Sequence, residues 1–234
     1  MYQSWNDLLF LHWRVEPHEI QRLLPNGLYV DCFDSCAFLG LVPFFMRNIR
    51  FRGTPSTPWL SNFLELNVRT YVFDENGRPG VWFLSLDCNQ PFAVWTARTL
   101  FHLPYQHATM RASLQNGRTI DYCSQRSTRK ESKTVSHFTY SFQNDVSYAQ
   151  PSTIEFFLAE RYLLFAVNRR KQILVGQVHH TPYPLCHVET QRVQTDLFEL
   201  NGFPSNQRPF DHVIGSRGVK VEVFALEKCS LRLV

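Results

Sequence analysis

The sequence predicts a mainly β protein of the α+β class, in which an antiparallel sheet is curled into a barrel or sandwich and about three short helices are added. Many short segments alternate apolar and polar residues with the two-residue period of a strand. Aromatic residues make up 15% of the chain, and they favour strands and large cores. Strands and helices do not alternate regularly, which argues against a parallel βαβ architecture. The 234 residues suit a single domain over residues 1–234 that buries about 70% of its unfolded surface.

The first quarter of the chain predicts strands interrupted by one short helix. Pro17–Leu24 has a proline in its first turn, carries its apolar residues on one side and closes at Pro25 to Gly27, which is typical of a short helix. Tyr29–Met46 is rich in aromatic and β-favouring residues, and Asp34 and Pro43 divide it into two expected strands. The flanking segments are an opening strand, Trp5–Val15, and a proline-rich loop, Arg52–Ser61.

A strand with a polar face follows this loop. Leu64–Val72 places Glu65, Asn67, Arg69 and Tyr71 on one face and mostly apolar residues on the other. Such a row of polar side chains either lines an internal cavity or faces solvent. In antiparallel sheets, one face of a strand is commonly exposed to solvent. The residues alone leave both alternatives open.

The polar strand is predicted to be one half of an antiparallel hairpin. Asp74 to Gly77 is a hairpin signal, and Val81–Asp87 is the expected return strand. Strict alternation divides the return strand between two faces. One face carries Trp82, Leu84 and Leu86, and the other carries Phe83, Ser85 and Asp87.

A helix is predicted over Pro91–Leu103, where apolar residues recur at helical spacing. It ends before Pro104, because the residue that precedes a proline is pushed out of helical geometry, and Pro104 with Tyr105 forms a corner into the next strand. A meander of strands follows, with the polar segment Arg126–Lys133 as a loop. These strands are Met110–Leu114, Gly117–Ser124 and His137–Phe142.

The last third of the chain predicts one capped helix, a hairpin and further strands. Ser152 to Glu155 is a capping box that opens a helix through about Glu160, and we expect Glu160 and Arg161 to form a structural ion pair. The other expected elements are a hairpin of Tyr162–Val167 and Ile173–His180, strands Val188–Gln194 and Val219–Leu226, and a short helix near Asp196 to Asn201.

The charge pattern favours an anionic small molecule as the partner. The net charge is +4, and the 24 basic residues divide into 19 Arg and 5 Lys. Arginine forks onto carboxylates and phosphates, whereas the basic clusters of this chain look like solvated faces rather than a nucleic-acid interface. We expect no nucleic-acid partner, and the aromatic richness is compatible with a homo-oligomer.

Several classes of protein are disfavoured by what the sequence lacks. It has no leader pattern and no apolar run near the roughly 18 residues of a membrane span, so we expect a cytoplasmic protein with no membrane segment and no membrane partner. It has no glycine-rich phosphate loop, nucleotide fingerprint or Gly-x-Ser-x-Gly elbow, so we expect no cofactor. We also expect no metal site, because the cysteines lack ligand spacing and the adjacent His179 and His180 point to opposite faces of a strand.

Seven segments carry a resemblance to a known family. They are Leu11–Val15, Leu41–Phe44, Glu65–Val72, Gly80–Asp87, Phe101–Tyr105, Glu155–Tyr162 and His180–Leu185. Together they resemble the YqjF-like bacterial proteins over nearly the whole chain. That family looks like a distant relative of acetoacetate decarboxylase, and the resemblance implies an acetoacetate-decarboxylase-like antiparallel β-barrel around a largely apolar pocket.

The resemblance also implies what the pocket would contain. The decarboxylase uses a lysine that forms a Schiff base, activated by a second lysine, and it is itself a standard example of such activation. The two lysine positions, which follow a helix and a corner, correspond here to Tyr105 and Gln106. We therefore expect no decarboxylation through an imine. The family's acidic pocket residue corresponds to Glu65, which favours a row of polar side chains that faces inward.

The combined prediction is a protein that binds a small anionic or carbonyl-bearing ligand in an internal pocket. Glu65 is the candidate acid or base, and Tyr105 is a candidate phenolic acid or a packed aromatic residue. Arg69 and Asn67 are candidate substrate-binding residues, and Arg69 would hold a carboxylate or meet Asp87. By strand rise, Glu65 and Arg69 are about 13 Å apart, too far to pair directly.

Two further residues and two further functions belong to this prediction. His102 and Arg98, on the preceding helix, are candidates for substrate binding, with local capping or pairing as the alternative. Whether the protein is an enzyme stays open; an enzyme would perform proton transfer or lyase-like chemistry on a keto acid without a lysine nucleophile. The alternatives are a binding module without catalysis, and an interaction or scaffold protein that uses exposed Arg-rich loops.

Overall fold

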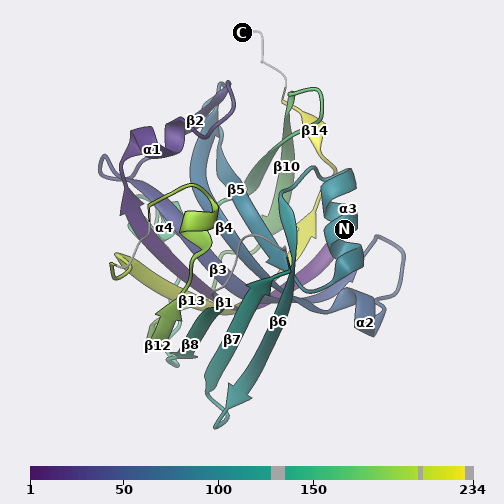
Figure 1. Ribbon diagram of the computed structural model, residues 1–234, viewed down its shortest axis with the longest axis vertical. Helices are drawn as coiled ribbons and strands as arrows, with labels where there is room; N and C mark the ends of the chain where they lie inside the picture. The colour runs from purple at the N-terminus through teal and green to yellow at the C-terminus, as the bar shows by residue number, and fades with distance from the viewer. Residues whose placement is uncertain (128–134, 205–207, 230–234) are drawn as a thin grey trace.

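The computed structural model describes residues 1–127, 135–204 and 208–229, in which the chain forms fourteen strands and five helices (Figure 1). The helices are α1 (Pro17–Gln21), α2 (Pro58–Ser61), α3 (Pro91–Leu100), α4 (Ile154–Ala159) and α5 (Leu197–Leu200). The strands of the N-terminal half are β1 (Tyr2–Val15), β2 (Leu28–Val30), β3 (Ala37–Arg50), β4 (Phe63–Asp74), β5 (Pro79–Cys88), β6 (Tyr105–Gln115) and β7 (Thr119–Arg126). Those of the C-terminal half are β8 (Ser136–Phe142), β9 (Leu163–Val167), β10 (Ile173–His180), β11 (Leu185–Cys186), β12 (Val188–Gln194), β13 (His212–Val223) and β14 (Glu227–Lys228).

Seven of the strands close a hydrogen-bonded ring. Its order is β5, β9, β10, β13, β1, β3 and β4, and β4 pairs back onto β5. A second branch of the sheet, β6, β7, β8 and β12, leaves the ring from β5. In Figure 1 this branch extends below the ring, which lies in the upper part of the molecule. The predicted mainly β class with a closed antiparallel sheet is confirmed.

Two parallel pairings depart from the predicted antiparallel pattern, and both involve β5. Its C-terminal end pairs in parallel with β6, and its N-terminal end pairs in parallel with β9. The β5–β6 connection contains α3, and a helical crossover is the usual way to join parallel neighbours. The chain therefore contains one βαβ unit, which the sequence pattern did not indicate, and this unit carries Tyr105 to the edge of the ring.

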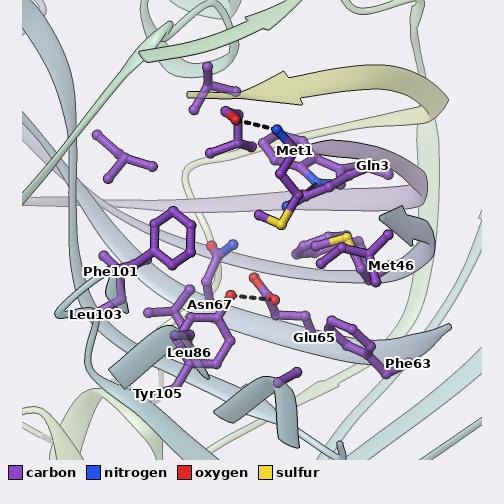
Figure 2. Close-up of a pocket in the computed structure, with 18 of the residues that line it drawn as sticks. Met1, Gln3, Met46, Phe63, Glu65, Asn67, Leu86, Phe101, Leu103 and Tyr105 are labelled. Atoms are coloured by element: carbon purple, nitrogen blue, oxygen red, sulfur yellow. Dashed lines mark hydrogen bonds between the residues drawn. The ribbon is translucent and has the colours of Figure 1, made fainter. Parts of the chain in front are cut away.

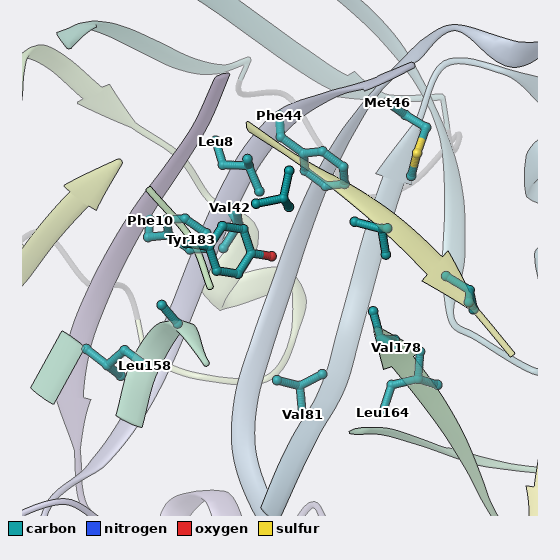
Figure 3. Close-up of a cluster of buried hydrophobic side chains, with 14 of the residues drawn as sticks. Leu8, Phe10, Val42, Phe44, Met46, Val81, Leu158, Leu164, Val178 and Tyr183 are labelled. Atoms are coloured by element: carbon teal, nitrogen blue, oxygen red, sulfur yellow. The ribbon is translucent and has the colours of Figure 1, made fainter. Parts of the chain in front are cut away.

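Strand β1 is buried on both faces and separates two apolar cores. Leu8 and Phe10 pack in the core enclosed by the ring, and Figure 3 shows them with residues from β3, β5, β9 and β10. Leu9 and Leu11 point the other way, into the core between the ring and the second branch. Because strands between two cores have no solvated face, polar residues on them must be satisfied inside the protein.

Most predicted elements of the N-terminal half are present with shifted ends. The helix at Pro17 is shorter than predicted, and α2 lies within the expected proline-rich loop. Strand β3 runs through Pro43, which we expected to interrupt it. The pairing of β1 with β3 is irregular between the Asn6–Phe45 and Leu11–Leu41 pairs. Pro43 lies within this irregular stretch of β3. Proline lacks a donor and is tolerated at such a bulge.

Two predictions for the C-terminal half are wrong. The helix after Pro151 is capped by Thr153, whose hydroxyl accepts from the Phe156 backbone N–H, and not by Ser152. The expected Glu160–Arg161 ion pair is wrong. Arg161 instead pairs with Asp31 at 2.6 Å, and Glu160 accepts hydrogen bonds from the Tyr162 hydroxyl and the Tyr183 backbone N–H.

Other predictions in this half agree with the structure. The β9–β10 hairpin and the strand Val188–Gln194 are present, and His180 is buried while its neighbour His179 is exposed. Of the predicted loop Arg126–Lys133, all but its first two residues lie outside the described residues. Arg126 itself ends β7 and is buried. No helix among the described residues has the length and apolar character needed to cross a lipid bilayer.

Candidate functional site

The ring encloses a cavity of about 430 Å³. Apolar side chains from β1, β3, β4, β5, β9 and β10 form most of its wall, and residues of α2 and α3 also contribute. Figure 2 shows part of this wall, including Met46, Phe63 and Leu86. A pocket of this size that is mostly apolar, with a few polar groups on its wall, is the usual form of a small-molecule site. Three of the polar residues, Glu65, Asn67 and Arg69, line the cavity from β4.

Glu65 and Tyr105 form the polar centre of the wall. Glu65 is 3% exposed, and its carboxylate accepts a hydrogen bond of 2.7 Å from the Tyr105 hydroxyl, drawn as a dashed line in Figure 2. Tyr105 reaches this position because it pairs with Leu86 at the start of the parallel β5–β6 ladder. Burial raises the pKa of Glu65 from 4.5 to about 7, and the Tyr105 hydrogen bond opposes part of that rise. A carboxyl group with this pKa exchanges a proton readily near neutral pH.

Asn67 is the second polar group on the wall, and its side-chain oxygen has no hydrogen-bond partner among the described residues. The residue is 5% exposed, and its side-chain oxygen is buried without a hydrogen bond. Figure 2 shows the amide directed into the cavity between Glu65 and Phe101. An unsatisfied buried amide costs about 1–3 kcal/mol, which a ligand hydrogen bond would recover. The hydroxyl oxygen of Thr96, on α3, is likewise buried without a partner on the same cavity.

Arg69 is the third polar group, and it is a buried charge with neutral partners. It is 7% exposed, and its Nε and Nη2 atoms donate to the Tyr71 hydroxyl at 3.3 and 3.2 Å. Nη2 also donates to the Leu158 carbonyl oxygen at 2.9 Å. Among the ion pairs of the described residues, none includes Arg69, and its Nη1 donates to none of these residues. A buried guanidinium without a counter-ion is a strong attractor for an anion.

Of the two alternatives for Arg69, a contact with Asp87 is wrong. Asp87 lies on the opposite face of the sheet, where it accepts from Arg126 Nε at 2.6 Å and from the Ser124 hydroxyl at 3.2 Å. A bulge in β5 causes this, because Ser85 pairs with Val68 and Phe83 pairs with Arg69, which leaves one extra residue between them. The bulge reverses the alternation. As a result, Phe83 and Leu86 line the cavity, whereas Ser85 and Asp87 face the second core.

The helix residues predicted to bind substrate do not line the cavity. Arg98 is exposed, and it donates from Nε to the Tyr105 carbonyl oxygen at 2.6 Å and from Nη2 to the Gln106 side chain at 3.1 Å. His102 has a positive φ of 51°, which ends the helical path after α3. Its neighbours Phe101 and Leu103 line the cavity instead. The alternative of local pairing therefore holds for Arg98, which fixes the backbone of Tyr105.

Arg161 on the cavity wall is a residue that sequence reasoning missed as part of the site. Its Nη1 is held by Asp31, its Nε donates to the Phe157 carbonyl oxygen, and its guanidinium lies over the Phe157 ring. Its guanidinium adds positive potential near Arg69. The pKa of Arg161 is lowered, mainly by burial and also by repulsion from the Arg69 charge. Arg161 is far from the polar strand β4 in sequence, and no sequence pattern indicated that it would lie on the cavity wall.

Neither the lysines of the described residues nor the one cluster of potential metal ligands found among them lines the cavity. The described lysines, Lys171, Lys220 and Lys228, are exposed and do not line it, and Lys130 and Lys133 are outside the described residues. One group of metal-type ligands occurs among the described residues, formed by Asp121, Cys123 and His137 on β7 and β8. The ring of His137 is hydrogen-bonded to Asp121 at 2.6 Å and to Arg192 at 2.9 Å. The adjacent guanidinium opposes the binding of another cation there.

Comparisons with known sequences connect the chain to one family. Residues 2–220 match the family DUF2071, described as an uncharacterized conserved protein. The uncharacterized protein YqjF of Bacillus subtilis (strain 168) is 38% identical over 202 residues, which cover 86% of this chain and 81% of YqjF.

Comparisons with solved structures show the fold. Acetoacetate decarboxylase from Legionella pneumophila superposes with a TM-score of 0.64 at 10% identity, over 100% of this chain and 88% of that one. An acetoacetate decarboxylase-like enzyme from Sphingomonas wittichii RW1 gives 0.65 at 11% identity, over 98% and 92%. The enduracididine biosynthesis enzyme MppR, complexed with pyruvate, gives 0.62 at 13% identity, over 98% and 90%. The ring of strands is therefore an acetoacetate-decarboxylase-like fold.

Proposed function

This chain belongs to the DUF2071 family, and we propose that it binds a small carboxylate with a carbonyl group in the cavity between Glu65 and Arg69. One observation carries the proposal. The cavity wall presents a proton-exchanging carboxyl group, Glu65, and an uncompensated guanidinium, Arg69, on the same face of β4. A ligand that carries an anionic end and a polar reactive end would satisfy both.

The spacing on β4 sets the size of the proposed ligand. Four residues of strand place the Cα atoms of Glu65 and Arg69 about 13 Å apart, and both residues line the cavity. Asn67 lies between them with an amide that needs a partner. The walls around this line are apolar. We therefore assign a ligand with its carboxylate at Arg69, a carbonyl near Asn67 and Glu65, and an apolar body.

The proposed chemistry is proton transfer next to the carbonyl. The ionised Glu65 would remove a proton from the carbon beside the carbonyl group, which leaves an enolate and a protonated Glu65; return of a proton to the enolate carbon would regenerate the Glu65 carboxylate. The Tyr105 hydroxyl would keep Glu65 in place through its 2.7 Å hydrogen bond. No imine is required, and the exposed positions of the described lysines support a reaction without one. The pyruvate complex of MppR is consistent with a keto acid as the ligand class.

A thermal-shift screen with paired ligands tests the binding proposal. We expect 2-keto and 3-keto acids to raise the melting temperature, and the matching neutral ketones to have little effect. Arg69→Met should abolish the preference for the acid, because it removes the only positive charge assigned to the carboxylate. The surface variant Arg170→Gln, in the β9–β10 turn, is the matched control and should respond as the wild type does. Equal shifts in wild type and Arg69→Met would overturn the assignment.

Deuterium exchange tests the chemical step separately. In D₂O, the protein should accelerate incorporation of deuterium beside the carbonyl of a bound keto acid, and Glu65→Gln should lose this acceleration while it still binds. Borohydride treatment of the complex should leave no covalent adduct on lysine. Binding without exchange would leave the protein as a carrier of such acids, and a lysine adduct would restore imine chemistry.

A further inference from the structure

The mouth of the cavity is formed by two separate segments of the chain. Of the residues that line the cavity, the solvent-exposed ones are Arg50, Phe51, Thr54, Pro55 and Phe92. The first four belong to the end of β3 and its connection to α2, and the last belongs to α3. The cavity therefore opens between this connection and α3, which lie on the same side of the molecule in Figure 1. We call residues 47–61 and 91–101 the rim.

The rim exposes large apolar side chains. Trp59 is 76% exposed, Trp95 is 60% exposed, and Phe51, Phe92 and Leu100 are each more than half exposed. Phe92 and Trp95 stack on one another with ring centroids 5.9 Å apart. Phe51 and Phe92 line the cavity, and the other three belong to the same two segments. A single exposed apolar side chain is ordinary, but five on the two segments that form the opening are of the kind that marks a binding surface.

The rim is also basic. The stretches 35–64 and 88–120, which contain it, hold no aspartate or glutamate. Arg50, Arg52 and Arg98 are all exposed on the rim. Tryptophan and phenylalanine combined with arginine, in the absence of acidic side chains, are what a peripheral protein presents to the headgroups of an anionic bilayer.

We propose that the rim docks on the surface of an anionic phospholipid membrane, with its aromatic side chains among the headgroups and the mouth of the cavity facing the lipid. A symmetric contact between two copies is disfavoured, because it would bring the rim arginines of both copies together. A membrane instead offers negative charge to the arginines and an apolar layer to the aromatic residues. In this position the mouth of the cavity opens toward the bilayer.

Vesicle sedimentation tests this docking with the ligand-free protein. We expect the wild type to sediment with vesicles of phosphatidylcholine and phosphatidylglycerol at low salt, and to stay in solution with phosphatidylcholine alone or at high salt. The double variant Trp59→Ser, Trp95→Ser should bind at least tenfold more weakly. The charge variant Arg50→Gln, Arg52→Gln should lose roughly thirtyfold at low salt.

Matched controls separate docking by the rim from general attraction. Tyr148→Ser removes an exposed aromatic ring that does not line the cavity, and Arg169→Gln with Arg170→Gln removes two exposed charges in the β9–β10 turn. Both should bind as the wild type does, and equal losses in these controls would overturn the proposal. It is also overturned if the wild type does not sediment with anionic vesicles. A wild-type dimer that Trp59→Ser, Trp95→Ser converts to a monomer, without vesicle binding, would instead identify the rim as an interface between copies.

Discussion

Two sets of opposite charges lie on the two faces of the β4–β5 pair, and they are built in different ways. On the face toward the second branch, Asp87 and Arg126 meet at 2.6 Å, and the Arg126 Nη2 atom also donates to the Ser85 hydroxyl. On the cavity face, Glu65 and Arg69 stand four residues apart on one strand, and the hydrogen bonds of their side chains go to neutral groups.

The difference separates a structural charge pair from a candidate binding site. A buried pair in contact compensates its own charges and holds two strands together. Two buried charges that are kept apart remain available, and each carries a cost of burial that a ligand could relieve. Burial raises the pKa of Glu65, and the Tyr105 hydroxyl offsets only part of that rise. Burial also raises the pKa of Asp87, although Arg126 pairs with it, so the partners of the charged groups distinguish the two faces and their pKa values do not. Buried charge therefore indicates function here only where a counter-charge is missing.

The largest expected effect on stability comes from breaking the ion pair between Asp87 and Arg126. Asp87→Asn leaves Arg126 as an uncompensated buried charge, so we expect the free energy of unfolding to fall by about 3–5 kcal/mol. Urea denaturation measures this. Glu65→Gln, the same carboxyl-to-amide change on the opposite face, is the control and should not destabilise the protein at neutral pH. A loss below 1 kcal/mol in Asp87→Asn would contradict the structural role of the pair.

The second effect is a dependence of stability on pH that comes from Glu65. Its pKa is raised in the folded protein, from 4.5 to about 7, so the folded state binds the proton more tightly than the unfolded state does. The protein should therefore be destabilised as pH rises from 4.5 to 7, by about 3 kcal/mol relative to Glu65→Gln. Denaturation of both proteins across this range gives the difference. A difference that does not change with pH would show that Glu65 has an ordinary pKa.

A smaller effect on stability is expected when the cavity face loses the Arg69 guanidinium. Arg69→Met removes hydrogen bonds to Tyr71 and Leu158 but also removes an uncompensated buried charge, and these changes partly cancel. We expect the free energy of unfolding to fall by about 1–2 kcal/mol. Arg126→Met should lower it by about 3–5 kcal/mol, because it leaves Asp87 buried without its counter-charge. Parallel urea denaturation of the two variants decides the comparison. Equal losses would mean that Arg69 is as structural as Arg126.

The smallest effect on stability should come from Tyr105→Phe. The change deletes one hydrogen bond, worth about 1 kcal/mol, and leaves the ring in place. Because that hydrogen bond favours the ionised carboxylate, its loss should raise the pKa of Glu65 further. Infrared titration of the carboxyl stretch would follow this shift. A fall in that pKa would mean that Tyr105 stabilises the protonated form.

Alternation along β4 was enough to predict which residues share a face, and the resemblance favoured the inward orientation. Glu65, Asn67 and Arg69 do lie together on the cavity wall. Their roles in binding and catalysis stay predictions. The same alternation failed on β5, because the bulge between Phe83 and Ser85 has no sequence signal of its own and reverses the faces beyond it.

Contacts between distant segments were also beyond the sequence. Arg126 ends β7, and nothing in its neighbourhood indicates that it would neutralise Asp87 on β5. The helical spacing of α3 predicted that the helix exists but not how it is rotated against the ring. That rotation turns Arg98 outward, and the positive φ of His102 then directs Phe101 and Leu103 into the cavity.

The pairing of β1 with β13 has a consequence for how the protein is made. The paired residues His12 and His212 are 200 residues apart in sequence, so the ring cannot close until nearly all of the chain has left the ribosome. Contacts of this range are slow to form, because the loop between them must be ordered first. Until the ring closes, part of the apolar surface of β1 that the closed ring buries is exposed, and exposed apolar surface makes incompletely folded chains prone to aggregate.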